Sequence, residues 1–318
     1  MTAFVLALAM AIGTGAYVRW AERCIDAGAP SWWFVLGAPL AYVAPALVIV
    51  TLSFALAWLW RTPRPPEARI GLRATARLYC TEVCVVALSW PLMVLHRWLM
   101  RDPAPAPAKH PVLLVHGVLV NDGVWLFFRR ELIRRGVGSI YTLSYGPPLA
   151  DIELFAEQLA TKIDAVRSST GAARVVLVGH SMGGLVARAY LRRFGGGAVA
   201  RLITLGTPHH GSVLAYLFPG RSLAQLHPGN PWLAELNRGE SAAPPAPTVS
   251  IWSWHDSMVA PQASAVFGGA DNVAFTGIAH NALLADQEVR GRVAREIADC
   301  AAGPSGAAKV DLTSTRRQ

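Results

Sequence analysis

The stretch Val175-Val-Leu-Val-Gly-His-Ser-Met-Gly-Gly-Leu-Val186 decides the fold that we expect for this chain. Aliphatic residues stop at Gly179, and a helical pattern begins after Gly184. This order predicts a buried strand, a tight turn and a helix, with Ser181 at the apex of the turn. Such a Gly-x-Ser-x-Gly turn strains the serine backbone and directs the hydroxyl out of the sheet, near the positive end of a helix dipole. Ser181 is therefore a candidate nucleophile, although so short a pattern also arises by chance.

Strands alternate with helices on both sides of this turn. The pattern predicts strands at 111–115, 139–143, 175–179, 201–205, 248–252 and 272–275. It predicts helices at 125–135, 151–166, 182–194 and 287–301, the second of them with Asp151 as its N-cap. Alternation of this kind is typical of an α/β fold, in which a mostly parallel sheet is covered by helices on both faces.

Two further side chains follow predicted strands at the points where those strands end. Asp256 comes after the strand at 248–252, and His280 comes after the strand at 272–275. Both are therefore expected at the same sheet edge as Ser181. A serine hydroxyl needs an adjacent base to act as a nucleophile, and the base needs an orienting carboxylate. Ser181, Asp256 and His280 together form a candidate catalytic triad.

Other assignments for these positions stay open. Asp271 and Asp286 are rival carboxylates, but Asp271 precedes its strand and Asp286 lies beyond His280 in the chain. Both fit less well with the order of serine, acid and histidine found in hydrolases that use this turn. Asp256 could also be a solvated turn residue, and His280 an ordinary loop histidine.

A tetrahedral oxyanion needs two backbone N–H donors beside the nucleophile. Met182 directly follows Ser181, and Val118 follows His116-Gly117 in the loop after the first strand of the domain. We expect the N–H groups of Met182 and Val118 to fill this role. Trp125 and Trp254 are candidate substrate-binding residues in the wall of an acyl pocket, with ordinary core packing as the alternative for each.

The stretch that begins at Thr207-Pro-His-His-Gly211 is rich in glycine and proline and extends to about residue 247. Long insertions of this kind commonly form caps or lids, so we expect a lid at about 208–247. His209 is expected at the rim of the site, as a substrate contact. Adjacent residues such as His209 and His210 rarely point at one ion, and no carboxylate accompanies them, so we expect no metal. Nothing in the sequence indicates a cofactor.

The composition indicates contact with a membrane. Hydrophobic residues make up 53% of the 318 residues and charged residues only 15%, against about 25% in soluble proteins. Residues 2–18 and 27–60 carry no charge, and a transmembrane helix needs about 20 such residues. We expect two transmembrane helices within 1–60, connected by a loop that contains Arg19, Glu22, Arg23 and Asp26. A signal peptide is the alternative for the first stretch, but no basic segment precedes it.

Residues 61–77 contain five arginines and a single acid, Glu67. Under the positive-inside rule this segment and the N-terminus are cytoplasmic. Residues 83–95 are apolar but too few to span a bilayer, which favours an interfacial or domain-packing helix over a third crossing. A third crossing would move the rest of the chain to the other side. An alternating proline linker ends the 61–108 region, the catalytic domain is expected at 109–302, and residues 303–318 are expected to be a disordered tail.

The net charge of +9 does not indicate nucleic-acid binding, because the chain has no long block of Lys and Arg and no nucleic-acid motif. Its four cysteines form no Cys-x-x-Cys pair, and we expect buried free thiols rather than a metal or redox site.

The chain resembles bacterial lipases and esterases of the α/β-hydrolase superfamily. The resemblance covers about residues 110–300 and depends on motifs in the family's order: His116-Gly117, Gly179 to Gly184, Leu205-Gly-Thr-Pro-His-His-Gly211, Asp256 with Val259, and Gly277-Ile-Ala-His-Asn281. It implies an α/β-hydrolase fold and hydrolysis of carboxylic esters through an acyl-enzyme intermediate. Ser181, Asp256 and His280 match the family's triad.

The chain differs from the secreted lipases in its N-terminal apolar segments, in lacking a cysteine pair within the catalytic domain and in lacking a matching pair of calcium-binding aspartates. We therefore expect a multi-pass protein of a bacterial inner membrane, with a serine hydrolase domain that faces the cytoplasm and cleaves a lipid or another apolar acyl ester. A thioesterase, an acyltransferase with the same triad, and a non-catalytic hydrolase fold that binds lipid or a protein partner remain alternatives.

Overall fold

A single sheet organises the part of the chain that follows residue 110. The structure is a computed structural model and describes residues 1–239 and 243–302. Six strands pair in parallel in the order β2-β1-β3-β4-β5-β6. Their bounds are β1 Val112–Val115, β2 Ile140–Leu143, β3 Val175–His180, β4 Val199–Leu205, β5 Thr248–Ser253 and β6 Asp271–Phe275. Every strand predicted from the sequence is present, and the predicted parallel arrangement is confirmed.

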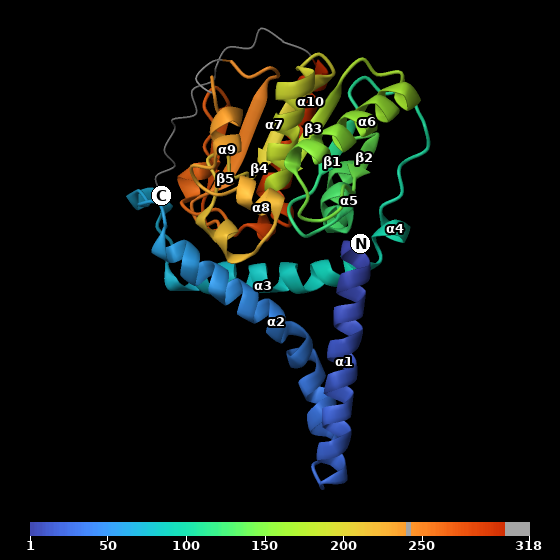
Figure 1. The fold of residues 1–318 in the computed structure, drawn as a ribbon, viewed down its shortest axis with the longest axis vertical. Coiled ribbons are helices and arrows are strands. Elements are labelled where there is room, and N and C mark those ends of the chain that lie inside the picture. The colour runs from blue at the N-terminus through green and yellow to red at the C-terminus, as the bar shows by residue number, and fades with distance from the viewer. Residues whose placement is uncertain (240–242, 303–318) are drawn as a thin grey trace.

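Helices cover both faces of this sheet (Figure 1). The α-helices are α1 Thr2–Asp26, α2 Ser31–Leu59, α3 Leu72–Val94, α4 His96–Leu99, α5 Leu126–Arg134, α6 Ile152–Thr170, α7 Met182–Phe194, α8 Arg221–Gln225, α9 Pro231–Leu236 and α10 Gln287–Ala302. Short 3-10 helices lie at η1 Pro66–Ala68, η2 Asp122–Trp125, η3 Val213–Leu217, η4 Gln262–Ala265 and η5 Asn281–Leu284. The predicted tail at 303–318 lies outside the described residues.

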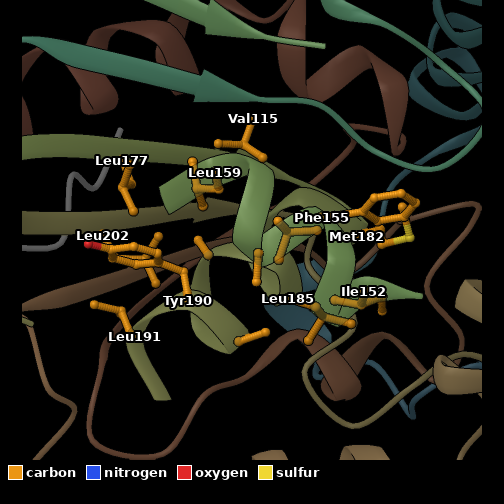
Figure 2. Close-up of a cluster of buried hydrophobic side chains, with 14 of the residues drawn as sticks. Val115, Ile152, Phe155, Leu159, Leu177, Met182, Leu185, Tyr190, Leu191 and Leu202 are labelled. Atoms are coloured by element: carbon orange, nitrogen blue, oxygen red, sulfur yellow. The ribbon is translucent and has the colours of Figure 1, made fainter. Parts of the chain in front are cut away.

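Alternate residues of each strand point to opposite faces of the sheet, and this divides the interior into two cores. Leu113 and Val115 face α6 and α7, where they join a cluster that includes Leu159 and Leu185 (Figure 2). Val112, on the opposite face, packs with residues of α5 and α10. The uninterrupted aliphatic run of the central strands is therefore explained by burial on both faces.

The order of the strands indicates where a site can form, because the chain adds β2 on one side of β1 and then β3 on the other side. β1 is flanked by β2 on one side and β3 on the other, so the chain leaves β1 and β3 at a topological switch point. In open parallel sheets the loops that leave such strands separate and create a crevice beyond their carboxyl ends. The loop that begins at His116 and the turn at Ser181 both start at this crevice.

The N-terminal helices α1 and α2 form a hairpin that extends away from the sheet domain, and α3 lies across the domain end of this hairpin (Figure 1). By length and composition α1, α2 and α3 are each able to cross a membrane. The loop that we expected at Arg19 to Asp26 is wrong, because those residues form the last turns of α1 and the connection is only 27–30. Helical hydrogen bonding continues through this charged end of α1.

The helix expected at 83–95 is longer than predicted, because α3 begins at Leu72 and includes Arg73 and Arg77 of the basic segment. Its last turns are fixed to the sheet domain. Asn121 Nδ2 donates to the Met93 carbonyl over 2.9 Å, and a Cβ at Gly123 would lie only 2.3 Å from the Leu92 carbonyl oxygen. This close backbone approach requires a glycine at 123. Helix α3 is thus part of the support of the sheet domain.

The four cysteines are free thiols, but they are less buried than we expected. Cys80 and Cys84 are exposed on α3, and Cys24 and Cys300 are partly exposed. The expectation of burial is wrong for the pair on α3, because the rest of the protein does not cover the face of the helix that carries them.

Candidate active site

The turn after β3 has the strained geometry expected of a nucleophile. Ser181 has φ 55° and ψ −128°, a conformation that is unfavourable for a residue with a side chain. Its N–H donates to the Leu205 carbonyl over 2.8 Å, and its own carbonyl accepts a 2.9 Å bond from Thr207 Oγ1. Bonds from β4 and the loop after it therefore hold the strained residue in place.

The glycines around Ser181 are required by close packing. A Cβ at Gly183 would lie 2.2 Å from the Val115 carbonyl oxygen, and one at Gly184 would lie 2.1 Å from Thr207 Oγ1. A Cβ at Gly179 would lie 2.6 Å from the Gly184 nitrogen. None of these contacts leaves room for a side chain, so the motif is explained by the close approach of strand, turn and helix.

Asp256 and His280 form a buried pair at the same edge of the sheet. His280 Nδ1 donates to Asp256 Oδ2 over 2.9 Å, and the two side chains are 5% and 2% exposed. The other carboxylate oxygen, Oδ1, accepts bonds of 2.7 Å from the N–H groups of Met258 and Val259. Asp256 is thereby fixed in orientation, and its bond to Nδ1 leaves Nε2 of His280 as the acceptor nitrogen.

The charge balance around His280 favours its protonated form. Burial by itself lowers the pKa of His280, but the charge and hydrogen bond of Asp256 and the charge of Glu82 raise the pKa above 6.5. The neighbouring His180 ring lies 4.7 Å from the His280 ring, and its Nε2 is 3.2 Å from the His280 carbonyl. Burial and the proximity of His280 keep the pKa of His180 well below 6.5. Of these two histidines, only His280 has a carboxylate partner.

Ser181 lies beside this pair without being hydrogen-bonded to it. A Cβ at Gly206, the residue after Leu205, would lie 3.0 Å from Asp256 Oδ2 and 3.2 Å from His280 Nδ1. Ser181 itself is bonded to Leu205, so all three side chains surround the end of β4. Within the described residues, no hydrogen bond joins Ser181 Oγ to His280. Catalytic bonds of this type commonly tighten only when substrate binds.

The structure places both candidate oxyanion donors near Ser181. A Cβ at Gly117 would lie 3.0 Å from Ser181 Cβ, so the loop that carries Val118 approaches the serine closely. Met182 is the first residue of α7. In the part of the chain that the structure describes, neither the Val118 nor the Met182 N–H has a hydrogen-bond acceptor. Both amides are thus available to a ligand at the helix N-terminus.

A cavity of about 420 Å³ begins at Ser181 and lies between the sheet domain and the N-terminal helices. This volume is within the range of small-molecule sites, roughly 300–1,000 Å³. The insertion predicted as a lid contributes η3 and α8 to its wall, and the loop after β1 contributes Val118, Leu119 and Val120. Met258, Val259 and Asn281 also line the cavity. Helices α1, α2 and α3 contribute Thr2, Leu6, Ile49, Leu52, Ser53, Val86, Ser89, Trp90 and Met93.

The three predicted substrate contacts do not line this cavity. Trp125 is fully buried in the core, with its ring 5.0 Å from the Phe128 ring. Trp254 packs on Trp252, and its carbonyl accepts a bond from Arg64. We correct these predictions, because Trp125 is buried in the core, Trp254 packs against Trp252, and neither lines the cavity at Ser181.

His209 is likewise not at the rim of the site. It is fully buried, with its Nδ1 3.2 Å from Arg188 Nη1 and its Nε2 3.2 Å from Thr204 Oγ1. Its ring stacks on Phe267 at 4.7 Å. Burial and the charge of Arg188 keep the pKa of His209 well below 6.5. The prediction of a rim residue is wrong because the insertion folds His209 inward, over β4 and β5.

One residue of the site was not found from the sequence. Glu82 on α3 is 1% exposed, and its carboxylate accepts bonds from the N–H groups of Asn281 (3.0 Å) and Ala282 (2.9 Å). It also accepts bonds from Asn281 Nδ2 (2.8 Å) and Ser257 Oγ (3.2 Å). Asn281 and Ser257 directly follow His280 and Asp256 in the chain. The sequence did contain one indication of this role, because Glu82 is the single acidic residue within the largely apolar α3. Acidic side chains in such helices are seldom buried without a function.

Parts of the chain are similar in sequence to known proteins. A family model described as PGAP1-like alpha/beta domain matches residues 139–240. Triacylglycerol lipases from Pseudarthrobacter phenanthrenivorans and Burkholderia plantarii are each 34% identical over 118 residues, which is 35% of this chain and 36% and 32% of theirs. The chain thus spans about a third of the length of these relatives.

Solved structures show the same fold. Lipase B from Aspergillus fumigatus superposes with a TM-score of 0.57 at 21% identity and covers 75% of this chain and 63% of its own. The mature lipase BlEst2 from Bacillus licheniformis has a TM-score of 0.52 at 19% identity, over 62% of this chain and 94% of its own. The parallel sheet with a serine elbow after β3 defines an α/β-hydrolase fold. The chain shares this fold with the two lipases, and over about a third of its length its sequence is similar to triacylglycerol lipases.

Proposed function

We propose that the protein is a membrane-anchored serine hydrolase that cleaves apolar acyl esters through an acyl-enzyme intermediate. The observation that carries the proposal is the meeting of a strained Ser181, a buried Asp256–His280 pair and an apolar cavity at one sheet edge. The relatives that match part of the chain are named triacylglycerol lipases, which favours a carboxylic ester as the substrate.

In the proposed reaction, Ser181 Oγ attacks the ester carbonyl carbon while His280 Nε2 accepts the serine proton. The Val118 and Met182 N–H groups stabilise the oxyanion, and the bond of Asp256 to Nδ1 keeps the imidazole in the tautomer that can accept this proton. His280 then protonates the departing alcohol oxygen as the carbon–oxygen bond breaks. A water molecule, deprotonated by His280, hydrolyses the acyl-serine and restores the enzyme.

We further propose that α1 and α2 anchor the protein in a bacterial inner membrane. Both ends of this helical hairpin lie on the side of the sheet domain (Figure 1). The basic segment at 61–77 follows α2, which favours a cytoplasmic position for the domain. Protease treatment of sealed inside-out and right-side-out vesicles tests this orientation. Cleavage of the domain in right-side-out vesicles alone would contradict it.

A fluorophosphonate probe on the full-length protein in detergent tests the chemistry. We expect covalent labelling of the wild type, none of Ser181→Ala, and unchanged labelling of Ser169→Ala, a serine on α6 distant from the crevice. Hydrolysis of nitrophenyl butyrate should follow the same pattern. An unlabelled wild type would instead favour the non-catalytic, lipid-binding alternative, and labelling without release of free acid would favour acyl transfer.

A further inference from the structure

The cavity at Ser181 is built jointly by the sheet domain and the helices proposed to lie in the membrane. Leu6 of α1 and Ile49 and Leu52 of α2 line it together with Ser181. Trp90 of α3 and Leu214 of η3 also belong to its wall. Because α1 and α2 supply this wall, the cavity is bounded by the membrane hairpin itself.

Three serine hydroxyl groups in the wall of the cavity are already hydrogen-bonded within the protein. Ser53 Oγ donates to the Ile49 carbonyl over 2.8 Å, and Ser89 Oγ donates to the Val86 carbonyl over 2.7 Å. Ser212 Oγ donates to the Met258 carbonyl over 2.7 Å. These hydroxyl protons are not available to a ligand, so the wall presents an apolar surface that suits a hydrocarbon chain.

The cavity also continues into an exposed apolar surface. Leu119, Leu217 and Phe218 line it and are 44%, 49% and 57% exposed. Ile49 and Leu52 are 48% and 57% exposed on the hairpin side. Exposed apolar residues that surround the mouth of a cavity are typical of a surface that contacts a membrane or a lipid.

From these three observations we infer that the acyl chain of a bilayer lipid ester binds between α1, α2 and η3, and that it reaches Ser181 from the membrane side. This inference rests on the proposed esterase function and adds the source of the substrate and the location of its acyl chain. The ester carbonyl would lie at Ser181, where the free Val118 and Met182 amides are, and the hydrocarbon chain would extend along Leu6 and Ile49.

The experiment compares Ile49→Trp with Val48→Trp in the full-length protein reconstituted in phosphatidylcholine vesicles. Both residues are about half exposed on α2, but only Ile49 lines the cavity. An added indole fills part of the acyl site. We expect kcat/KM for nitrophenyl palmitate to fall about tenfold in Ile49→Trp, with nitrophenyl butyrate little changed and Val48→Trp like the wild type. The palmitate rate should also follow the mole fraction of ester in the vesicles.

Equal palmitate rates in the two variants would overturn the inference, as would a rate that depends only on bulk ester concentration. A different result is expected if the protein is not a serine esterase. In that case the wild type would hydrolyse neither ester and would not be labelled by fluorophosphonate.

A second inference comes from Glu82, whose contacts are independent of the cavity wall. Its carboxylate accepts two backbone bonds at the start of η5, from Asn281 and Ala282, and a side-chain bond from Ser257. The loops that carry His280 and Asp256 are therefore joined to α3 through one buried acid. We infer that Glu82 is a positioning residue that holds the Asp256–His280 pair in register and adds negative charge beside His280.

Glu82→Gln removes this negative charge. It also places an amide N–H₂ group beside hydrogen-bond donors of Asn281, Ala282 and Ser257, which donate to the carboxylate in the wild type. We expect kcat for nitrophenyl butyrate to fall roughly tenfold with KM little changed, because the effect is on the base and not on ester binding. The acidic limb of the pH–rate profile should move to lower pH, because the charge of Glu82 contributes to the raised pKa of His280.

Glu296→Gln is the matched control, because Glu296 of α10 is also buried but pairs with Arg201 and Arg292, away from the crevice. This control should change thermal stability without moving the acidic limb of the pH–rate profile.

Glu82→Asp keeps the negative charge, so it should lower kcat and leave the acidic limb near its wild-type position. The inference would be overturned if Glu82→Gln changed only thermal stability. If Glu82→Gln does not fold, the test uses Glu82→Asp alone. A wild-type kcat in Glu82→Asp would then overturn the inference that Glu82 is a positioning residue.

Discussion

Nδ1 of His280 lies 2.9 Å from Oδ2 of Asp256, although the two residues are carried by different loops and come together only at the edge of the sheet. Both side chains are almost fully removed from solvent. A carboxylate that is buried and bonded in this way can fix both the orientation and the tautomer of the imidazole. Activity should therefore depend on this pair and on the packing that holds Ser181 beside it.

Asp256→Asn should abolish most of the activity while the fold is kept. The introduced amide can keep its oxygen on the Met258 and Val259 N–H groups, so its N–H₂ group would face His280 Nδ1. Nδ1 must then accept a bond, and the proton moves to Nε2, which can no longer take the serine proton. We expect kcat for nitrophenyl butyrate to fall on the order of 10⁴-fold.

The control for this substitution is Asp271→Asn. Asp271 is the first residue of β6, whereas the candidate site lies beyond the carboxyl ends of the strands. Its carboxylate pairs with Arg292 over 2.9 Å. The activity of this variant should remain within about twofold of the wild type, because exposed ion pairs contribute little. A larger loss in Asp271→Asn than in Asp256→Asn would show that the assignment of the acid is wrong.

The activity of the wild type should rise with pH through a midpoint above 6.5. His280 must be neutral to accept the serine proton, and burial is outweighed by Asp256 and Glu82, which raise the pKa of His280. The base is therefore inactive below this raised pKa and active above it. The measurement is kcat/KM for nitrophenyl butyrate between about pH 5 and 9. A midpoint clearly below 6.5 would contradict the charge balance described for the pair.

Acid should destabilise the protein through its buried neutral histidines. Burial lowers the pKa of His116 from 6.5 to about 4, and it also lowers the pKa values of His180 and His209. The unfolded chain then binds more protons than the folded one, so stability is present above pH 6.5 and lost as the pH falls toward 4. For His116 alone the loss is roughly 3 kcal/mol. His280 has the opposite sign, since its raised pKa stabilises the fold below pH 6.5.

Thermal unfolding in detergent at about pH 7 and about pH 4.5 measures this effect. The melting temperature should be lower at the acidic pH, and His116→Asn should reduce the difference because it removes one titrating ring. A melting temperature that is higher at the acidic pH would mean that His280 outweighs the other histidines.

Gly183→Ala should disrupt the elbow. The added Cβ would lie 2.2 Å from the Val115 carbonyl oxygen and 2.5 Å from that of His116, and neither backbone group can move without displacing β1. We expect a loss of about 1–3 kcal/mol in the free energy of unfolding, together with reduced fluorophosphonate labelling. Gly197→Ala is the control, because nothing lies within 4 Å of the added Cβ. Similar stability of the two variants would show that the elbow is packed less tightly.

Local patterns in the sequence determined the sheet domain to a large extent. Every predicted strand agrees with the structure within one or two residues, because a run of aliphatic residues between turns is a local signal of a strand buried on both faces. The positions of Ser181, Asp256 and His280 followed from one further rule, that parallel strands end at a common edge. This rule brings residues together without knowledge of their side-chain contacts, and the bond between Asp256 and His280 agrees with it.

Only the tertiary structure decided which other residues reach the site. Glu82 precedes His280 by almost 200 positions, and its bonds to Asn281 and Ala282 depend on the docking of α3, which no local spacing encodes. Trp125 was expected in the wall of an acyl pocket and His209 at the rim of the site, but side-chain packing directs both into the interior. The contribution of α1 and α2 to the cavity wall at Ser181 is also decided by tertiary structure. The apolar pattern of a helix indicates that the helix is buried, but it does not indicate which element covers it.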